Sequence, residues 1–319
     1  MKKIAVLTSG GDAPGMNAAI RAVVRSGLVN DLEVFGIENG FKGLYENSIR
    51  QMFHKDVSDI MVRGGTILGS ARLPEFKEPE VIDMAVENLK NLDIEALVAL
   101  GGDGTYRGAL ELSKRGIACV GLPATIDNDV VTTEYSIGFD TALNTIIEAI
   151  DKLRDTSASH QRCSIVEVMG NLCGDLALYS GISSGAELVI TNRTGFNEAE
   201  VLERLRYLES IKEKRHAIVV ISEKITDVEK FAQKVSEETP FSGRATILGH
   251  VQRGGSPSAF DRVLATRMGD YAISMILRGE KGVCVGLVGN KLVCTDLEEM
   301  LNQSDYSRQE LYDMHKRLV

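Results

Sequence analysis

The chain has 319 residues, of which 44% are hydrophobic and 25% charged, a composition typical of globular proteins and a length that favours about two domains. Its net charge of -9, the absence of Trp and an aromatic content of 5% argue against a general nucleic-acid binder, because basic surface and stacking rings are scarce. No stretch approaches the ~20 apolar residues of a membrane-spanning helix. We therefore expect neither nucleic acid nor a membrane among its partners.

Short apolar runs alternate with helical patterns along the chain. The predicted strands are, in chain order, Ile4–Thr8, Leu32–Ile37, Ala96–Leu100, Cys119–Leu122, Cys163–Met169, Glu187–Ile190 and Ala217–Ile221. Most are almost wholly apolar, which is typical of parallel strands that are covered on both faces. Apolar residues at three- and four-residue spacing from Phe139 to Leu153 predict a long amphipathic helix. The predicted fold class is α/β, doubly wound, with mainly parallel sheets.

The sequence indicates the domain boundaries less clearly than it indicates the individual strands and helices. A second strand–helix series begins around Cys163, so we predict a domain change near residue 139. The glycine-rich run Gly249–Ser256 is a candidate for the place where the chain crosses back. The charged stretch beyond about residue 296 predicts surface helices. The five cysteines are dispersed without a C-x-x-C pair, which favours buried reduced thiols and a cytoplasmic protein.

A glycine-rich loop, Thr8–Asn17, follows the first predicted strand and precedes a helical pattern from Met16 to about Leu28. A strand–glycine turn–helix presents free backbone N–H groups and the positive end of the helix dipole, which together bind phosphates. The run matches neither a P-loop nor G-x-G-x-x-G. A tight turn that needs glycine for backbone reasons alone is almost equally compatible with this loop.

The run Gly101–Thr105 (GGDGT) follows the strand Ala96–Leu100 and opens another helix. Its three glycines allow the backbone to approach a polyphosphate. Asp103 beside anionic phosphates makes sense as a ligand of Mg²⁺, directly or through water. Its alternative role, as a helix N-cap, explains the carboxylate but not the glycines around it.

The run Thr125–Asp129 (TIDND) comes directly after the strand Cys119–Leu122. Asp/Asn-rich turns are common, so the run alone indicates little. However, the carboxyl ends of neighbouring parallel strands meet at one edge of a sheet. The TIDND run is the third predicted strand end, after those at Thr8 and Leu100, that carries groups able to bind phosphate or to transfer a proton. We therefore predict Asp127 as a general base and Asp129 as a second electrostatic or metal-linked partner.

These three loops lie in the order and spacing of bacterial ATP-dependent 6-phosphofructokinases, and the chain resembles that family nearly from end to end. The GGDG run alone is less specific, because lipid kinases and NAD kinases also carry it. Further matching segments are Arg63–Thr66, Gly69–Arg72, Gly138–Ala142, Arg154–Thr156, Ser159–Arg162, Glu167–Gly170 and Leu248–Pro257. The resemblance implies two Rossmann-like domains: residues 1–138 plus about 251–304 for the nucleotide, and 139–250 plus about 305–319 for the sugar phosphate.

The resemblance also implies an activity, the transfer of a phosphoryl group from MgATP to the 1-hydroxyl of fructose 6-phosphate in glycolysis. The implied catalytic residues are Asp127, which takes the hydroxyl proton, with Thr125, Asp129 and Arg72. The implied nucleotide positions are Gly11, Arg72, Leu73, Gly102, Asp103, Gly104 and Thr105, with Asp103 serving Mg²⁺. The implied fructose 6-phosphate positions are Thr125, Ile126, Asp127, Arg162, Met169, Gly170, Asn171, Glu223, Arg244, His250, Val251, Gln252 and Arg253.

In this family Arg162 and Arg244 act from the neighbouring subunit, so the resemblance implies a homotetramer. It also implies an allosteric site between subunits for ADP or phosphoenolpyruvate. The matching effector positions are Arg21, Arg25, Arg154, Gly185, Glu187, Lys212 and Lys214. Without the resemblance, an exposed basic helix face explains Arg21 and Arg25 equally well.

Several positions depart from the family. Asn171 replaces an arginine beside the reacting phosphates, and His54 replaces an effector-site arginine. The surroundings of the purine are changed at Phe41, Leu73 and Glu111. Relatives that use pyrophosphate carry Asp in place of Gly104 and Lys in place of Ala124, so these two small residues favour ATP.

Two alternatives stay open. A regulatory paralogue that binds sugar phosphate or nucleotide but catalyses poorly is consistent with Asn171, His54 and Leu73. The retained residues Asp103 and Asp127 argue against it, because a binder without catalysis needs no base. Another GGDG kinase is a weaker option, since the TIDND run and the downstream sugar-phosphate set do not belong to it.

Overall fold

A computed structural model describes residues 2–210, 214–303 and 308–319. The chain forms two compact units, each with its own sheet. Unit 1 comprises Met1–Ile126, Val130–Thr141 and Arg253–Asp305, and unit 2 comprises Asp127–Asp129, Ala142–Gln252 and Tyr306–Val319. None of the described helices combines the length and the apolar character needed to span a membrane.

Unit 1 is built on a seven-stranded sheet of order β11-β10-β5-β4-β1-β2-β3, in which only the two edge strands run antiparallel to their neighbours. Its strands are β1 (Lys3–Thr8), β2 (Glu33–Ile37), β3 (Ile49–Met52), β4 (Ala96–Gly101), β5 (Ala118–Pro123), β10 (Val283–Val288) and β11 (Lys291–Asp296). The central strands are buried along their whole length, because helices cover both faces of the sheet.

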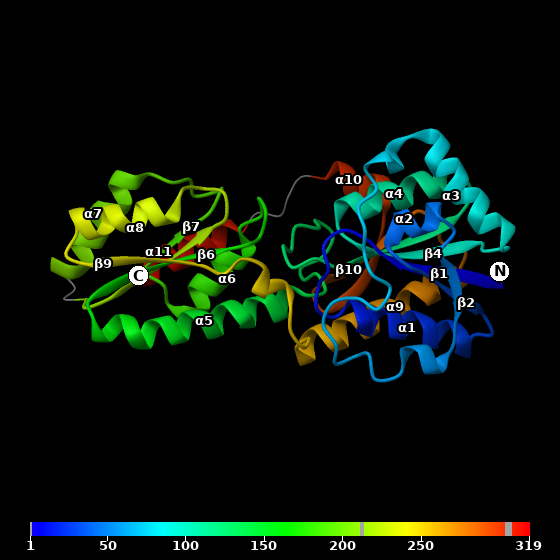
Figure 1. Ribbon diagram of the computed structural model, residues 1–319, viewed down its shortest axis with the longest axis horizontal. Helices are drawn as coiled ribbons and strands as arrows, with labels where there is room; N and C mark the ends of the chain where they lie inside the picture. The colour runs from blue at the N-terminus through cyan, green and yellow to red at the C-terminus, as the bar shows by residue number, and fades with distance from the viewer. Residues whose placement is uncertain (1, 211–213, 304–307) are drawn as a thin grey trace. The chain divides into compact units, whose positions relative to one another are not determined.

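The helices of unit 1 divide between those two faces. Helices α1 (Met16–Val29) and α9 (Ala259–Leu277) lie on one face and pack closely, so that a Cβ on Gly269 would lie 2.7 Å from Ala22 Cβ (Figure 1). The other face buries a separate apolar cluster. Its elements are α2 (Gly40–Tyr45), α3 (Pro79–Asn91), α4 (Asp103–Lys114), α10 (Leu297–Asn302) and the 3₁₀ helix η2 (Pro74–Lys77), while η1 (His54–Val57) follows β3.

Unit 2 is built on a four-stranded parallel sheet of order β7-β8-β6-β9. Its strands are β6 (Arg162–Val168), β7 (Leu188–Ile190), β8 (Ala217–Ser222) and β9 (Ser242–Ile247). Helices α7 (Glu198–Ser210) and α8 (Val228–Glu238) cover one face, and α5 (Phe139–Ser159) and α6 (Asp175–Ser184) lie on the other (Figure 1). The 3₁₀ helix η3 (Gly249–Arg253) and the C-terminal helix α11 (Gln309–Leu318) complete the described elements.

The predicted fold class is confirmed, and each predicted strand is a strand in the structure. The long helix predicted from residue 139 continues to Ser159. Two expectations need correction. The stretch beyond residue 296 does contain helices, but α11 buries Tyr312 and His315 rather than lying wholly at the surface. Four of the five thiols are buried, whereas Cys294 is only half-buried at the edge strand β11.

A buried carboxylate, Asp261 of α9, ties together the two places where the chain passes out of unit 1 and back. Its Oδ1 accepts from the backbone N–H of Gly138 at 3.0 Å, and its Oδ2 accepts from that of Thr141 at 2.8 Å. The backbone N–H of Ser258 donates in turn to Thr141 Oγ1 at 2.9 Å. Burial is the main cause that raises the pKa of Asp261 from 3.8 to about 6, although these donors oppose the rise.

The raised pKa of Asp261 predicts a pH-dependent contribution to stability. A carboxyl whose folded-state pKa exceeds its unfolded value binds its proton more tightly in the native protein, so its stabilising contribution is fully present below the unfolded pKa. That contribution is lost as pH rises through the folded pKa of about 6. We expect the free energy of unfolding of the wild type, relative to Asp261→Asn, to increase by about 1 kcal/mol between pH 7 and pH 5.

This prediction is checked by guanidinium denaturation of both proteins at the two pH values. Asp270→Asn is the matched control, because Asp270 lies exposed on the same helix and should show no such pH dependence. A difference between wild type and Asp261→Asn that stays constant from pH 7 to pH 5 would contradict the assignment.

Candidate active site

The first two predicted loops and the start of the third, Thr125 and Ile126, lie at one edge of the unit 1 sheet, whereas Asp127–Asp129 belong to unit 2. Strands β5, β4 and β1 are neighbours and run parallel, so their carboxyl ends meet at the same edge. Backbone hydrogen bonds join the loops directly: Ser9 N–H donates to Leu100 O at 2.9 Å, and Ala124 N–H donates to Gly101 O at 3.0 Å. The convergence expected from parallel topology is therefore present.

The glycines after β4 have two different functions. A Cβ on Gly101 would lie 2.1 Å from Thr105 Oγ1 and 2.6 Å from Ser9 O, so Gly101 allows the first two loops to pack together. At Gly102 and Gly104 an added Cβ would meet nothing within 4 Å, which leaves open space at the N-terminus of α4. Thr105 Oγ1 is buried there and has no hydrogen-bond partner within the described residues. This combination is suited to a phosphate group.

Asp103 is the first residue of α4, and Gly102, not Asp103, is the N-cap. The alternative N-cap role for Asp103 is therefore wrong. The side chain is exposed, and partial burial raises its pKa, against an opposing effect of the Arg107 charge. The described residues contain no group of three or more His, Cys, Asp or Glu side chains that could hold a metal ion by themselves. A single carboxylate still fits Mg²⁺, which is commonly held by one or two carboxylates together with substrate phosphates.

The segment that carries Arg72 is fastened to the β1 loop. Thr8 Oγ1 donates to Gly69 O at 2.8 Å, and Ser70 Oγ donates to Gly10 O at 2.6 Å. Arg72 follows as an exposed cation, while Leu73 is half-buried against the apolar cluster. The β1 loop and the segment of Arg72 are therefore held together in unit 1.

The predicted changes around the purine have specific structural settings. Phe41 is buried, stacks on Phe76 with ring centroids 4.3 Å apart, and lies over Gly108, where a Cβ would be 2.6 Å from its ring. Glu111 forms ion pairs with Lys114 at 3.0 Å and Arg115 at 2.9 Å, and hydrogen bonding to Lys114, then to Arg115, lowers its pKa. Both residues are already engaged in packing or ion pairing.

Arg253 lies at the glycine loop of β1. A Cβ on Gly11 would be 1.9 Å from Arg253 Nη1, so the guanidinium lies directly against this glycine and would have to shift to admit a side chain. Its Nε is buried without a hydrogen-bond partner in the part of the chain that the structure describes. Gly11 was predicted from the nucleotide set and Arg253 from the sugar-phosphate set, and unit 1 brings the two together.

The loop that carries the predicted base is held at its N-terminal end. Thr125 O accepts from Ser136 Oγ at 2.7 Å, and Ala124 forms an isolated parallel bridge with Ile137. The side chain of Ile126 is buried, so only its backbone is placed to contact a substrate. Asp127 and Asp129 are half-buried, on either side of Asn128, whose φ of 56° is left-handed.

A second group of predicted residues lies at the carboxyl edge of the unit 2 sheet. Strands β8, β6 and β9 are neighbours and parallel, and Glu223, Met169–Asn171 and the η3 segment follow their ends. Asn171 N–H donates to Glu223 Oε1 at 3.0 Å, and Met169 N–H donates to Gln252 Oε1 at 3.2 Å. Gln252 is completely buried, and its Nε2 donates to Gly249 O. Its side chain therefore links the end of β6 to the η3 segment.

The remaining side chains of this edge differ in exposure. His250 and Val251 are exposed, and Gly170 is buried. Burial, with the Glu223 charge as a second cause, raises the pKa of Glu167, the residue next to the end of β6. Asn171 itself has a φ of 51°, a conformation that asparagine adopts more readily than most residues. The edge therefore combines two carboxylates, Glu167 and Glu223, with one imidazole, His250.

Two predicted residues of unit 2 do not join this edge. Arg162 is the first residue of β6, at the opposite end of the strand from Met169, and its Nη1 donates to Thr156 Oγ1 at 3.1 Å. Arg244 is paired with Ser164 in the middle of β9 and is exposed. A residue six positions along a strand is about 20 Å away. Within unit 2, neither arginine is close to the other predicted sugar-phosphate residues.

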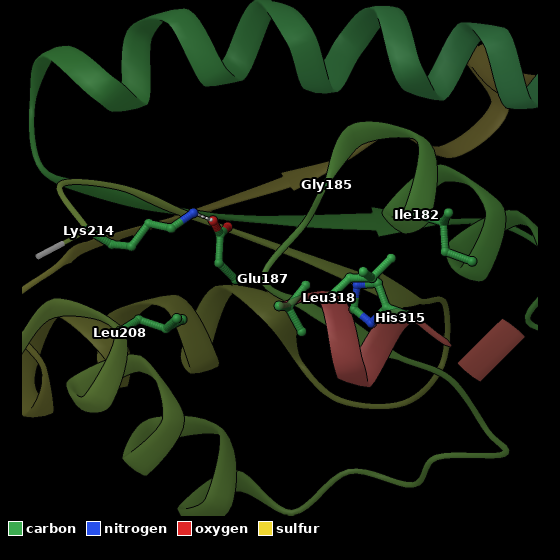
Figure 2. A pocket seen from close by; sticks show the side chains of 8 residues that line it. Ile182, Gly185, Glu187, Leu208, Lys214, His315 and Leu318 are labelled. Carbon is green, nitrogen blue, oxygen red and sulfur yellow. Dashed lines mark hydrogen bonds and ion pairs between the residues drawn. The ribbon is translucent and has the colours of Figure 1, made fainter. Parts of the chain in front are cut away.

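Three of the predicted effector residues of unit 2, Gly185, Glu187 and Lys214, line a pocket of about 240 Å³. Figure 2 shows Glu187 and Lys214 pointing toward each other across it, with Gly185 nearby. Lys214 Nζ lies 2.7 Å from Glu187 Oε1, and Glu187 Oε2 accepts from Ile218 N–H at 2.7 Å. Arg154 donates to Ser184 O, next to Gly185, while Lys212 lies outside the described residues.

Arg21 and Arg25 belong to unit 1 and share a face of α1. Burial, and then the charge of Arg25, lowers the pKa of Arg21. Arg25 Nε is buried and, within the described ranges, lacks a hydrogen-bond partner. His54, the departure from the family, is exposed at the start of η1.

Sequence reasoning missed two buried carboxylates, Asp175 and Asp261, and the half-buried Arg308, which hold loop segments in place. Asp175 accepts from Asn128, which lies between the two aspartates of the predicted base loop, and Arg308 pairs with Asp175. Each contact joins positions far apart in the sequence, so no local spacing could have indicated it. For Asp175 the available signal was the charge itself within the largely apolar stretch 172–178, whereas the surroundings of Asp261 and Arg308 are more polar and carry no such signal.

Three comparisons relate the chain to known proteins. A family model described as Phosphofructokinase matches residues 3–276. The ATP-dependent 6-phosphofructokinases of Photobacterium profundum and Vibrio cholerae are each 53% identical to it over 320 residues, covering 100% of this chain and 99% of theirs. A phosphofructokinase structure from Saccharomyces cerevisiae is similar with a TM-score of 0.90 and 33% identity, covering 99% of this chain but only 50% of the yeast chain. The chain therefore spans about half the length of that yeast relative.

Proposed function

The chain belongs to the phosphofructokinase family, and we propose that it is an ATP-dependent 6-phosphofructokinase of glycolysis, acting in the cytoplasm. It transfers the γ-phosphoryl group of MgATP to the 1-hydroxyl of fructose 6-phosphate, giving fructose 1,6-bisphosphate and ADP. One observation carries the proposal. Within unit 1, the segment Thr125–Ile126 that leads into Asp127 follows β5 directly, beside β4, and the end of β4 opens onto the unobstructed glycines Gly102 and Gly104.

On the nucleotide side, the N-terminus of α4 and the backbone of Gly102 and Gly104 hold the phosphates. Preorganised N–H donors stabilise the charge that develops on the transferring group. When Mg²⁺ is bound it neutralises phosphate charge, and Asp103 is the residue that would hold it. Arg72 and Arg253 add positive charge at the same edge of unit 1.

On the sugar side, Asp127 accepts the proton of the 1-hydroxyl as its oxygen forms the new bond to phosphorus. The bond between phosphorus and the oxygen of the leaving ADP breaks, so the base ends protonated and the charge stays on ADP. Glu223, the backbone at Met169 and Gly170, and His250 are placed to orient the sugar phosphate at the edge of the unit 2 sheet. A positioned base contributes about 100- to 10,000-fold in rate.

The distant positions of Arg162 and Arg244 support an oligomer. Both cations lie away from the other sugar-phosphate residues of their own unit, as described above, so they would serve the site of a neighbouring copy. Arginine is suited to this role because its planar guanidinium binds a phosphate through two hydrogen bonds. We propose a homotetramer, with ADP or phosphoenolpyruvate as an effector at the pocket shown in Figure 2.

The proposal is tested by a coupled assay for fructose 1,6-bisphosphate with ATP, GTP and pyrophosphate as alternative donors. We expect turnover with ATP, its loss when EDTA removes Mg²⁺, and its recovery when Mg²⁺ is restored. Little turnover is expected with pyrophosphate, because residue 104 is Gly and residue 124 is Ala. No turnover with any donor, together with measurable binding of fructose 6-phosphate, would instead identify a regulatory paralogue.

A further inference from the structure

The short segment Asp127–Asp129 is anchored within unit 2 through its middle residue. Asn128 is 5% exposed and adopts a left-handed φ of 56°, which is tolerated by asparagine. Its Nδ2 donates to Asp175 Oδ2 at 2.9 Å, and its carbonyl oxygen accepts a weak hydrogen bond from Cys173 Sγ at 3.6 Å. The orientation of the two flanking aspartates therefore depends on where Asp175 is held.

Asp175 is a buried carboxylate at the beginning of α6, and the same oxygen that accepts from Asn128 also faces Arg308. Arg308 Nε and Nη2 lie 3.2 and 3.1 Å from Asp175 Oδ2. The side chains of Asp175 and Arg308 are 4% and 15% exposed. Removing one partner of such a pair is strongly unfavourable, because the other is left as an uncompensated buried charge.

Arg308 is itself held by α11, which begins at the next residue. The buried face of this helix carries Tyr312 and His315, at spacings of four and seven residues from Arg308. Tyr312 Oη lies 2.9 Å from Thr191 Oγ1, and His315 Nε2 lies 2.9 Å from Ala186 O. Figure 2 shows His315 and Leu318 at the pocket wall, and the contacts of Tyr312 and His315 hold the middle of α11 against the rest of unit 2.

We propose that Arg308 is a positioning residue for phosphoryl transfer: from the start of α11 it holds Asp175, and Asp175 holds Asp127–Asp129 through Asn128. The proposal rests on the proposed function, in which Asp127 is the general base. Arg308 does not need to touch either substrate. Its loss allows the Asp175 carboxylate to reorient or to draw in other donors, and the Asn128 anchor is then released. A misplacement of 1 Å at a reacting group can cost about 100-fold in rate.

The test compares Arg308→Gln and Arg308→Lys with the wild type at a temperature at which circular dichroism shows all of them folded. We expect Arg308→Gln to lower kcat by about 10- to 100-fold, with KM for fructose 6-phosphate within about threefold, since orientation and not binding is lost. Arg308→Lys keeps the charge and should recover most of the rate. Arg206→Gln is the control, because Arg206 also pairs with a carboxylate of unit 2, Glu238, at 3.1 Å, but it lies on α7, on the sheet face opposite α6.

A double-mutant cycle tests the route through Asp175. In the double variant Asp175→Asn/Arg308→Gln no buried charge is left unpaired, and the amide oxygen at position 175 can still accept from Asn128. If Arg308 acts through Asp175, Arg308→Gln should cost less than about threefold in kcat in that background. If Arg308→Gln lowers kcat by the same factor in the wild-type and Asp175→Asn backgrounds, the proposed route through Asp175 is overturned. If Arg308→Gln alone does not fold, the Asp175→Asn protein and the double variant still give the comparison.

Amide hydrogen exchange supplies a measurement that is independent of activity. Residues 127–129 should exchange faster in Arg308→Gln, while strands β6 and β8 keep their protection. The proposal is overturned if Arg308→Gln only lowers the melting temperature. In that case kcat stays within twofold of the wild type, exchange of residues 127–129 is unchanged, and Arg308 has a purely structural role. If the wild type shows no turnover, the proposed function fails, and the exchange of residues 127–129 still decides whether Arg308 holds this segment.

Discussion

Asp127→Ser is expected to lower kcat by about 100- to 10,000-fold, because it removes the group that takes the proton of the attacking hydroxyl. KM for fructose 6-phosphate should stay within a few-fold. The sugar phosphate is held mainly by other groups of the unit 2 edge, such as the backbone at Met169 and the carboxylate of Glu223. Fold stability should change little, since the side chain is only half-buried.

Steady-state kinetics and direct binding of fructose 6-phosphate, measured on the same preparations, check this expectation. Asp151→Ser is a suitable control, because Asp151 is an exposed carboxylate of unit 2 on α5. Turnover of Asp127→Ser within a few-fold of the wild type would show that the general base has been assigned wrongly.

Gly104→Asp is expected to lower kcat/KM for ATP by about 100- to 1,000-fold while leaving the melting temperature unchanged or slightly raised. A Cβ at residue 104 meets nothing within 4 Å, so the new side chain starts in open space. An acidic residue in the first turn of α4 also interacts favourably with the helix dipole. The same carboxylate would face the nucleotide phosphates, and juxtaposed like charges cost several kcal/mol.

The control for this substitution is Gly104→Ala, which adds the Cβ without the charge and should keep most of the activity. Thermal melting and kinetics with variable ATP distinguish electrostatic repulsion from steric damage. If Gly104→Asp uses ATP within fivefold of Gly104→Ala, the phosphates do not bind at the N-terminus of α4.

The predicted strands could be recognised because they are buried on both faces, so their residues are apolar without alternation. The missed edge strands lack that signal: β3 reads IRQM, β9 reads SGRATI and β11 reads KLVCTD, all with polar residues facing outward. Strand β10, VCVGLV, is apolar and buried for most of its length, and the same pattern could have revealed it. Local sequence thus predicts central strands far better than edges, where one side of the strand is solvated.

Helix α11 illustrates a second limit of local sequence. Its charged composition predicted a surface helix, yet it buries Tyr312 and His315 and begins next to the ion pair of Arg308 with Asp175. Those partners are 133 residues apart. Composition measures how polar a helix is on average, whereas its buried face depends on which side chains the rest of the fold presents to it.

The amino-acid sequence by itself determined the parallel α/β class, the three glycine- and acid-rich strand ends and the chemistry they are suited to, because these follow from local apolar runs and from residue types at turns. Only the tertiary structure decided which strands are neighbours, that Arg253 lies against Gly11, and that Asp175, Asp261 and Arg308 hold the loops in place. The physical reason is that the role of a buried charge, or of a glycine at a close approach, depends on the group that packs against it. That group is brought close by packing and not by spacing along the chain.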